Sequence, residues 1–331
     1  MIKQKTIFAI CAAILIAGVF VPHQADAATK YPRRMDGLYV TKAKVNLWPV
    51  AVMIDNHTAA RPQSGLQSAS IVYESLAEGG IPRFMALFVG ASSTSRIGPV
   101  RSTRPYFVNY ASEYGAAVAH AGGSPDGLKA VKNLRLVSLF ALKGSTAKLF
   151  YRALGGGVHG LYSNMKNLIA GMKAARVYKY QPKYRTYPRV DDATLAARGR
   201  NKSGVFIDFG YGKSYDVEYR YDKKINAYRR FTGGRVHKDR VTNRQIQVKN
   251  VVIINVPKER VLDRKGRLDI KVIGKGTGYL LQNGKAIKIT WKKANAHAHT
   301  YIYLADKSEA KLVRGNTWFE IVPKGHKVKL L

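Results

Sequence analysis

The sequence predicts an α+β protein in which a mixed α/β region at residues 49–175 precedes a mostly antiparallel β region at residues 201–331. In the first region, apolar runs of strand length alternate with segments that carry helix-capping residues. In the second, short strand-like runs follow one another, separated by turn sequences such as Asn283-Gly284. A Tyr- and Pro-rich segment at residues 176–200 is the predicted linker. A chain of 331 residues is long enough for one or two domains with buried cores.

The N-terminal segment, residues 1–27, has the features of a secretory signal peptide. Two lysines precede an apolar run at residues 7–21, and Ala25-Asp26-Ala27 follows as a cleavage site. This run is shorter than the roughly 20 residues that a membrane-spanning helix needs, so we expect cleavage between Ala27 and Ala28. Cys11 lies early in the run and follows Ile10, where a lipidation signal needs a small residue, so we expect no lipid anchor. The protein is therefore predicted to be extracytoplasmic, either secreted or associated with the cell wall.

The chain is strongly basic, with 56 Lys and Arg against 20 Asp and Glu and a formal net charge of +36. Outside the cytoplasm, the abundant polyanions are wall polymers of teichoic type and anionic lipid headgroups. Nucleic acid would be the first partner to consider inside a cell, but only the net charge points to it here. The positive charge is spread evenly over both halves, which is more typical of adaptation to an anionic envelope than of a nucleic-acid-binding stripe. We expect the partner to be an anionic cell-wall polymer or a membrane surface.

The elements of the first region follow an extension at residues 28–48. Apolar runs predict strands at residues 49–54, 70–78, 83–89 and 116–119. Ser102 or Thr103 is expected to cap a helix that has Pro105 in its first turn and ends at Gly115. A second helix is expected at about residues 161–174.

The second region is expected to consist of strands joined by turns. The strands are predicted at residues 204–209, 215–221, 227–231, 250–256, 268–273, 285–291, 300–304 and 317–322. The glycine-rich segment Gly274–Gly278 and the pair Asn283-Gly284 are predicted turns between them.

Acidic residues are scarce at residues 28–190, and three of the six lie in or beside apolar strands. A carboxylate costs free energy there unless it has a partner or a role. Asp55 ends a strand before a polar loop, where open α/β sheets place ligands, and is the strongest candidate. On one regular strand, Glu74 and Glu78 would lie about 13 Å apart, farther than the roughly 5–9.5 Å of a glycosidase pair. A buried ion pair between Glu78 and Arg83 is the preferred interpretation of Glu78.

Arginines gather at the start of the first predicted helix, in the segment Arg101–Arg104. Free N–H groups, the positive end of the helix dipole and two guanidinium groups together predict an anion site. Arg61, in a neighbouring polar loop, is expected to add a third guanidinium. The alternative, given equal weight, is that these arginines form ion pairs with Asp55 or Glu74.

Two histidines and one serine are further candidates. His120 follows a strand and precedes Gly122-Gly123, so it is a candidate general acid or base, although a local hydrogen bond explains it equally well. His159 lies in a glycine-rich loop that is expected to close over the site. Ser124 is a nucleophile candidate without an identifiable partner. We find no P-loop, dinucleotide fingerprint, nucleophile elbow or zinc spacing in the sequence, so we expect no cofactor and no metal.

Many of these motifs together resemble the YerB-like family, which comprises bacterial extracytoplasmic proteins built on a domain of unknown function. In the first half, the resemblance rests on Met53–Asn56, Arg61–Leu66, Val72–Glu74, Glu78–Gly80, Arg83-Phe84, Ile97–Ser102, Arg104-Pro105 and His120–Ser124. In the second half, it rests on Tyr221-Asp222, Tyr228, Asn250–Val252, Val272–Gly274, Gly284-Lys285, Trp291-Lys292 and Trp318–Ile321. The resemblance spans nearly all of residues 45–325 and implies an extracytoplasmic location, with members often described as lipoproteins. This chain departs from the family at Ser70, where an Asp is expected, and in lacking a lipidation signal.

Two functions remain in view, and the sequence leaves open whether the protein is an enzyme. The preferred hypothesis is a non-enzymatic envelope protein that binds an anionic wall polymer or lipid headgroup through the arginine-rich helix start. The alternative is a hydrolase or transferase that acts on cell-wall glycan or phosphodiester bonds, with Asp55, Glu74 and His120 as acid–base groups. The residues expected to contact a ligand are Asn56, Arg61, Glu78, Arg83, Arg101, Ser102, Arg104, Ser124 and His159.

Overall fold

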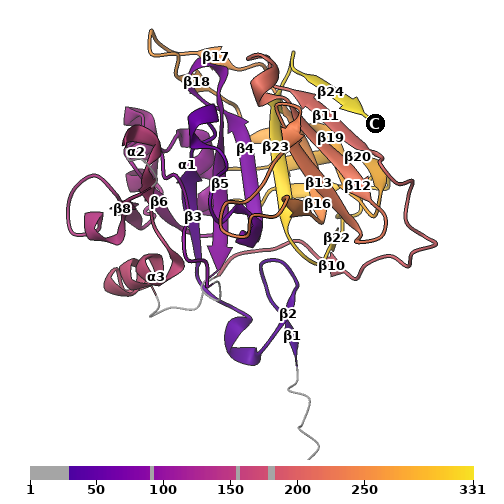
Figure 1. Cartoon of the computed structure of the whole chain (residues 1–331), viewed down its shortest axis with the longest axis horizontal. Helices are drawn as coiled ribbons and strands as arrows, with labels where there is room; N and C mark the ends of the chain where they lie inside the picture. The colour runs from indigo at the N-terminus through magenta and orange to yellow at the C-terminus, as the bar shows by residue number, and fades with distance from the viewer. Residues whose placement is uncertain (1–29, 90–92, 154–156, 178–182) are drawn as a thin grey trace, which may run out of the picture.

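A ten-stranded mixed sheet runs through the whole molecule. The computed structural model describes residues 30–89, 93–153, 157–177 and 183–331, so the predicted signal peptide lies outside the described residues. The strand order of this large sheet is β21-β20-β19-β16-β23-β4-β5-β3-β6-β7. Figure 1 shows its two halves side by side, with indigo and purple strands from the first half of the sequence and yellow and orange strands from the second.

Each half of the sequence contributes five neighbouring strands to the large sheet. The first half supplies β3 (Pro49–Ile54), β4 (Ile71–Leu76), β5 (Pro82–Val89), β6 (Ala117–His120) and β7 (Ser138–Phe140). The second half supplies β16 (Asn250–Val256), β19 (Gly274–Gln282), β20 (Lys285–Lys293), β21 (Tyr301–Tyr303) and β23 (Thr317–Pro323). The halves join where β23 pairs with β4 in parallel, with Trp318 opposite Val72 and Glu320 opposite Glu74. The predicted α+β class is confirmed, and the two regions share one sheet.

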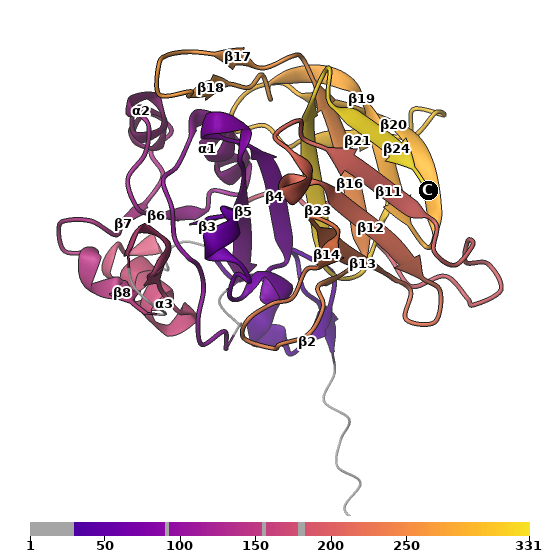
Figure 2. The same ribbon diagram turned by 45° about the horizontal axis from the view of Figure 1, so that its top comes forward.

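A smaller, six-stranded sheet covers one face of the large sheet at this junction. Its strands are β11 (Gly204–Asp208), β12 (Val217–Asp222), β13 (Ala227–Thr232), β14 (Arg235–Val236), β15 (Gln247–Val248) and β24 (Lys327–Leu330). Figure 2 shows it beside β16 and β23. Tyr219 of β12 packs edge-on against Trp318 of β23, with ring centroids 6.3 Å apart, and Trp318 also contacts Phe84 of β5. Aromatic packing therefore holds the two sheets together.

Helix α1 (Pro105–Glu113) lies on the other face of the large sheet, and α2 (Pro125–Asn133) packs against α1. Helix α3 (Met165–Ala174) packs against Leu139 of β7, on the same face as the six-stranded sheet. Tyr110 of α1 stacks on Tyr73 of β4 at 4.3 Å, and Tyr73 stacks on Phe319 of β23 at 4.6 Å. Because successive strand residues point to opposite faces, Tyr73 faces α1 while Glu74 faces the six-stranded sheet. None of the helices in the described part of the chain is long and apolar enough to cross a membrane.

Four short strand pairs complete the described structure. They are β1 (Tyr31–Pro32) with β2 (Tyr39–Val40), β8 (Tyr151–Arg152) with β9 (Leu161–Tyr162), β10 (Arg189–Val190) with β22 (Leu312–Val313), and β17 (Arg260–Val261) with β18 (Leu268–Asp269). Two of these pairs correct predicted bounds. Because Leu161 and Tyr162 pair with β8, helix α3 begins only at Met165, with Asn164 as its N-cap. The strand expected at residues 268–273 ends already at Asp269.

Two other predictions of local structure need correction. Arg104 is the N-cap of α1, rather than Ser102 or Thr103, although Pro105 does lie in the first turn as expected. The segment Gly274–Gly278 is not a turn but the beginning of strand β19. By contrast, strands 49–54 and 250–256 have the predicted bounds, and the turn at Asn283-Gly284 joins β19 to β20 with positive φ at both residues.

Candidate functional site

Asp55 lies at the end of β3, in contact with Arg101. The backbone brings them together, because Asp55 N–H donates to the Pro99 carbonyl at 2.8 Å and Arg101 N–H donates to the Met53 carbonyl at 2.9 Å. Arg101 Nε is 3.0 Å from Asp55 Oδ2, and this contact is an ion pair without the alignment of a hydrogen bond. Asp55 is only 3% exposed. This contact agrees with the alternative in which the helix-start arginines form ion pairs with Asp55.

Two histidines complete the surroundings of Asp55. His159 Nδ1 donates to Asp55 Oδ2 at 2.7 Å, and His57 N–H donates to Oδ1 at 2.9 Å. The His57 and His159 rings stack, with centroids 4.7 Å apart and planes 17° apart. The contact with Asp55 fixes the orientation of His159 and leaves its Nε2 without a hydrogen-bond partner among the described residues. His159 therefore reaches the site as expected, and Asp55 positions it.

Glu78 belongs to a second cluster, with Arg83 and Arg104. Arg104 Nε donates to Glu78 Oε1, and Arg83 Nη2 donates to Oε2 at 3.3 Å, so the preferred ion-pair interpretation of Glu78 is confirmed. Burial alone would raise the pKa of Glu78, but the hydrogen bond from Arg104 and the charges of both arginines lower it. Strand β4 ends at Leu76, so Glu78 does not continue the strand of Glu74, and the spacing expected for one regular strand does not apply.

The arginines at the helix start are thus already paired with carboxylates. Arg101 contacts Asp55, while Arg104 contacts Glu78 and also donates to the Thr103 carbonyl. Ser102 Oγ donates to the Ala121 carbonyl at 2.8 Å. This geometry favours the alternative in which the helix-start arginines form ion pairs, with Glu78 as the partner of Arg104.

Glu74 lies in a buried network at the junction of the two sheets. Arg230 of β13 donates through Nη2 to Glu74 Oε2, and Asn56 Nδ2 donates to Oε1 at 2.9 Å. Glu74 and Arg230 are both fully buried. Arg230 also lies against the Trp318 ring, 4.8 Å from its centroid. The proposed acid–base role of Glu74 therefore needs correction, because a fully buried carboxylate paired with arginine has no access to a polymer substrate.

Glu320 lies beside Glu74 in this network, on the parallel neighbour strand. Tyr219 O–H donates to Glu320 Oε1 at 2.5 Å. Burial and the negative charge of Glu74 raise the pKa of Glu320 well above its usual value. The raised pKa favours the protonated form of Glu320, and Glu74 is the carboxylate that forms the ion pair with Arg230.

The network continues toward the surface through amide and imidazole groups. Gln63 Nε2 donates to Asn56 Oδ1 at 3.1 Å, and His237 Nε2 donates to Gln63 Oε1 at 2.8 Å. Arg230 Nη1 donates to His237 Nδ1, so the ring must be neutral. Burial and the charges of Arg230 and Arg61 hold the pKa of His237 well below its usual value. Asn56 is thus an interior link of this network rather than a ligand contact.

His120 and Ser124 have local structural partners. His120 is 1% exposed, and its ring nitrogens contact the Gly122 carbonyl at 2.8 Å and Ser138 Oγ at 2.9 Å. Burial lowers the pKa of His120. Ser124 caps α2 by accepting the Gly127 N–H at 3.1 Å. Of the two interpretations of His120, the geometry favours the local hydrogen bond. Among the described residues, neither His120 nor Ser124 forms a hydrogen bond with Asp55 or its partners.

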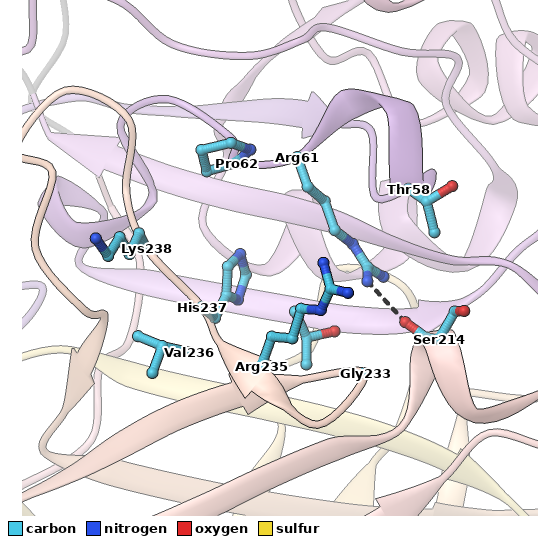
Figure 3. A pocket seen from close by; sticks show the side chains of 10 residues that line it. Thr58, Arg61, Pro62, Ser214, Gly233, Arg235, Val236, His237 and Lys238 are labelled. Carbon is cyan, nitrogen blue, oxygen red and sulfur yellow. Dashed lines mark hydrogen bonds between the residues drawn. The ribbon is translucent and has the colours of Figure 1, made fainter.

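A basic cavity of about 580 Å³ opens beside the surface end of the network (Figure 3). Its lining residues are Thr58, Arg61, Pro62, Ser214, Thr232, Gly233, Arg235, Val236, His237 and Lys238. None of these lining residues, all in the described part of the chain, carries a carboxylate, whereas Arg61, Arg235 and Lys238 are cationic. Figure 3 shows the guanidinium groups of Arg61 and Arg235 pointing toward one another.

Two polar atoms in this cavity lack partners. Arg61 Nε donates to Asn56 Oδ1 at 3.1 Å and Nη1 donates to the Ser214 carbonyl at 2.7 Å, but Nη2 is buried without a partner among the described residues. Thr232 Oγ1 is likewise buried and unpartnered within the described structure. Buried polar atoms usually have hydrogen-bond partners, so these two mark a place where a ligand atom fits.

Sequence patterns indicated Arg61 but not the rest of the cavity. Arg235, Lys238 and Thr232 lie in the other half of the chain, in and beside β13 and β14. The available signal was the basic stretch Arg235–Arg240 after a Gly-Gly turn. No group of three or more His, Cys, Asp or Glu side chains suited to a metal ion occurs among the described residues.

Comparison with known proteins places this fold and these motifs in one family. Residues 35–179 match the family described as "Protein of unknown function (DUF3048) N-terminal domain", and residues 205–319 match its C-terminal domain. The "Putative lipoprotein YerB" of Bacillus subtilis (strain 168) is 32% identical over 325 residues, which covers 97% of this chain and 96% of that protein. The crystal structure of the YerB protein from Bacillus subtilis matches with a TM-score of 0.77 at 30% identity, covering 89% of this chain and 98% of the other.

Proposed function

The chain belongs to the DUF3048 family, and from this premise we propose that it is an extracytoplasmic protein that binds an anionic group of a cell-wall polymer or a lipid headgroup. The description of its Bacillus relative as a lipoprotein supports an extracytoplasmic location. The signal sequence predicted at residues 1–27 and the strongly basic composition support the same location and an anionic partner.

One observation carries the proposal, namely the cavity that Arg61, Arg235 and Lys238 line without any carboxylate among its lining residues. Two guanidinium groups that face each other repel, and an anion between them converts this repulsion into charge-assisted hydrogen bonds. The free Nη2 of Arg61 and the hydroxyl of Thr232 supply further donors. A phosphate group, with acceptor oxygens on every side, matches this arrangement of donors.

Arg61 is the one arginine that the proposed cavity shares with the anion site predicted from the sequence. The other predicted arginines, at the helix start, are not part of the cavity. Arg101 and Arg104 each contact a carboxylate already, so an external anion would have to displace Asp55 or Glu78. In the cavity, an anion displaces only solvent. Among the described residues, neither Arg235 nor Lys238 takes part in an ion pair, and both side chains are exposed.

Calorimetric titration with inorganic phosphate and with a poly(glycerol phosphate) tests this proposal. We expect Arg235→Gln and Lys238→Gln each to weaken binding, by about tenfold or more for the arginine, since hydrogen bonds to charged groups contribute about 1.5–3 kcal/mol. Arg264→Gln and Lys265→Gln are matched controls, because they remove the same charges from exposed positions away from the cavity. An equal loss of affinity in all four variants would show that binding depends only on net charge and would overturn the proposal.

A second candidate function rests on the contact between Asp55 and His159. A buried carboxylate that orients a partly exposed imidazole is the arrangement of a general base, and Arg101 lies beside it. In a phosphodiester hydrolase, His159 Nε2 would remove a proton from water as the oxygen attacks phosphorus, and the leaving alcohol would take up a proton as its P–O bond breaks. In this candidate, His159 takes the acid–base role that the sequence-based hypothesis gave to Glu74 and His120. Both of those residues are buried and have structural partners.

Turnover of phosphodiester and wall-glycan substrates tests the second candidate. We expect His159→Gln to abolish hydrolysis and Asp55→Asn to reduce it strongly, while His57→Gln, which removes only the stacked ring, has a smaller effect. If the unaltered protein hydrolyses neither substrate class, or if His159→Gln retains full activity, this candidate fails. Phosphate binding in the cavity does not depend on that result.

A further inference from the structure

A large groove lies on the outer face of the six-stranded sheet. It has a volume of about 1000 Å³ and lies between strands β12 and β13 and the segment 195–202. The lining residues are Leu195, Ala196, Asn201, Lys202, Arg220, Tyr221, Asp222, Lys223, Lys224, Arg229 and Phe231. None of them lines the cavity around Arg61, so a ligand of this groove is independent of the proposed function.

The floor of this groove is apolar although it faces solvent. Leu195 is 58% exposed and lies beside Phe231 among the residues that line the groove. Phe231 forms part of the floor, and the Arg220 guanidinium lies over its ring, 4.6 Å from the centroid. The lining also includes several Lys and Arg side chains, residue types whose methylene groups cover apolar surface while the charge stays in water.

The rim of the groove is basic. Arg220 is paired with Glu218 at 2.6 Å, and Arg229 is paired with Asp222 at 2.8 Å. By contrast, the ammonium groups of Lys202, Lys223 and Lys224 form no ion pair or hydrogen bond within the described residues. Three uncompensated positive charges therefore surround an apolar floor.

We propose that this groove binds an anionic phospholipid, with an acyl chain along the floor at Leu195 and Phe231 and the phosphate facing Lys202, Lys223 and Lys224. The complementarity has two parts, an apolar channel for hydrocarbon and a cationic rim for a headgroup. A wall polymer has no apolar part to cover the floor, and a zwitterionic lipid leaves the lysines uncompensated. The groove thus supplies membrane attachment to a chain in which we expect no lipid anchor.

Vesicle co-sedimentation of the secreted, processed protein tests this assignment. The probes are vesicles of phosphatidylcholine alone and vesicles of phosphatidylcholine mixed with phosphatidylglycerol. The key variant is Leu195→Asp, and its matched control is Leu142→Asp, which makes the same change at a leucine of similar exposure, 56%, in the first half of the chain. We expect Leu195→Asp to reduce binding to the anionic vesicles by about tenfold or more and Leu142→Asp to leave it within about twofold.

Salt separates groove binding from general attraction of a basic protein to an anionic surface. At about 0.5 M salt, exposed charges are strongly screened, whereas contact between the acyl chain and the floor persists. We expect some vesicle binding to remain at high salt and Leu195→Asp to remove it. We also expect the double variant Lys223→Gln/Lys224→Gln to lose more vesicle binding than the double variant Lys265→Gln/Lys327→Gln. Three results would each overturn the proposal: equal effects of the two leucine variants, complete loss of binding at high salt, or equal binding to both kinds of vesicle.

Discussion

At the scale of single residues, the decisive feature is the buried pair of carboxyl groups at the junction of the halves. Glu74 pairs with Arg230, while Glu320, beside it on the next strand, is held protonated by burial and by the charge of Glu74, which raise its pKa. The sequence identified Glu74 as an unusual acid in an apolar strand but could not identify its partner. Arg230 lies 156 positions away, on β13, and only the packing of the six-stranded sheet against the large sheet brings the two residues together.

The protonated state of Glu320 predicts a pH-dependent effect of its replacement. Between its unfolded pKa, about 4.5, and its raised folded pKa, the folded protein keeps a proton that the unfolded chain releases. The contribution of Glu320 to stability is therefore complete below about pH 4.5 and declines as the pH rises. Gln resembles the neutral acid but does not titrate, so we expect Glu320→Gln to raise the Tm at pH 7 and to change it little at pH 4.

Thermal unfolding of the two proteins across this pH range checks the prediction. Glu218→Gln is the control, because Glu218 lies on the neighbouring sheet with a partly exposed side chain paired with exposed Arg220. A Tm difference for Glu320→Gln that does not change with pH, or that has the opposite sign at pH 7, would show that Glu320 is ionised in the folded protein.

At the scale of elements, local patterns predicted most strands because their apolar runs are long and uninterrupted. Residues 49–54 and 250–256 are buried on both faces of the sheet and have the predicted bounds. The glycines of Gly274–Gly278 were misleading. In β19, a Cβ atom at Gly278 would lie only 1.8 Å from the Ile253 carbonyl oxygen, and one at Gly276 would lie 2.7 Å from Trp291 Nε1. These glycines allow close approach of neighbouring groups, which a single sequence does not distinguish from a turn.

The close approach at Gly278 predicts that even one methyl group there is destabilising. We expect Gly278→Ala to lower the free energy of unfolding by about 1–3 kcal/mol, because backbone atoms of β16 must move to make room. Thr277→Ala, at the exposed neighbouring position of the same strand, should change it by less than about 0.5 kcal/mol. Urea denaturation measures both values. Equal stability of Gly278→Ala and the unaltered protein would contradict the strand assignment.

At the scale of the whole molecule, the two halves of the sequence form one structural unit. They share the large sheet through β4 and β23, and Glu113 of α1 accepts a hydrogen bond from Lys293 of β20 at 2.9 Å. The composition of residues 176–200 predicted a linker, but no local sequence pattern indicated that strands from the two sides of this linker pair with each other. For the same reason, the cavity around Arg61, which both halves build, could not be predicted.

This shared sheet predicts that the halves do not fold separately. Without β23, strand β4 would become an edge with a fully buried Glu74 that has lost Arg230. We therefore expect residues 28–177 alone to show no cooperative unfolding transition by circular dichroism, and co-expression with residues 183–331 to restore one. A cooperative transition of the isolated N-terminal half would contradict this.

The most direct test of whether the cavity around Arg61 binds anions is a crystal structure of the protein with tungstate, a tetrahedral anion with strong anomalous scattering. We expect an anomalous peak between the guanidinium groups of Arg61 and Arg235, within hydrogen-bond distance of Thr232 Oγ1. A peak at Arg101 or Arg104 instead, with only water in the cavity, would contradict this expectation. It would support the anion site that the sequence predicted at the helix start.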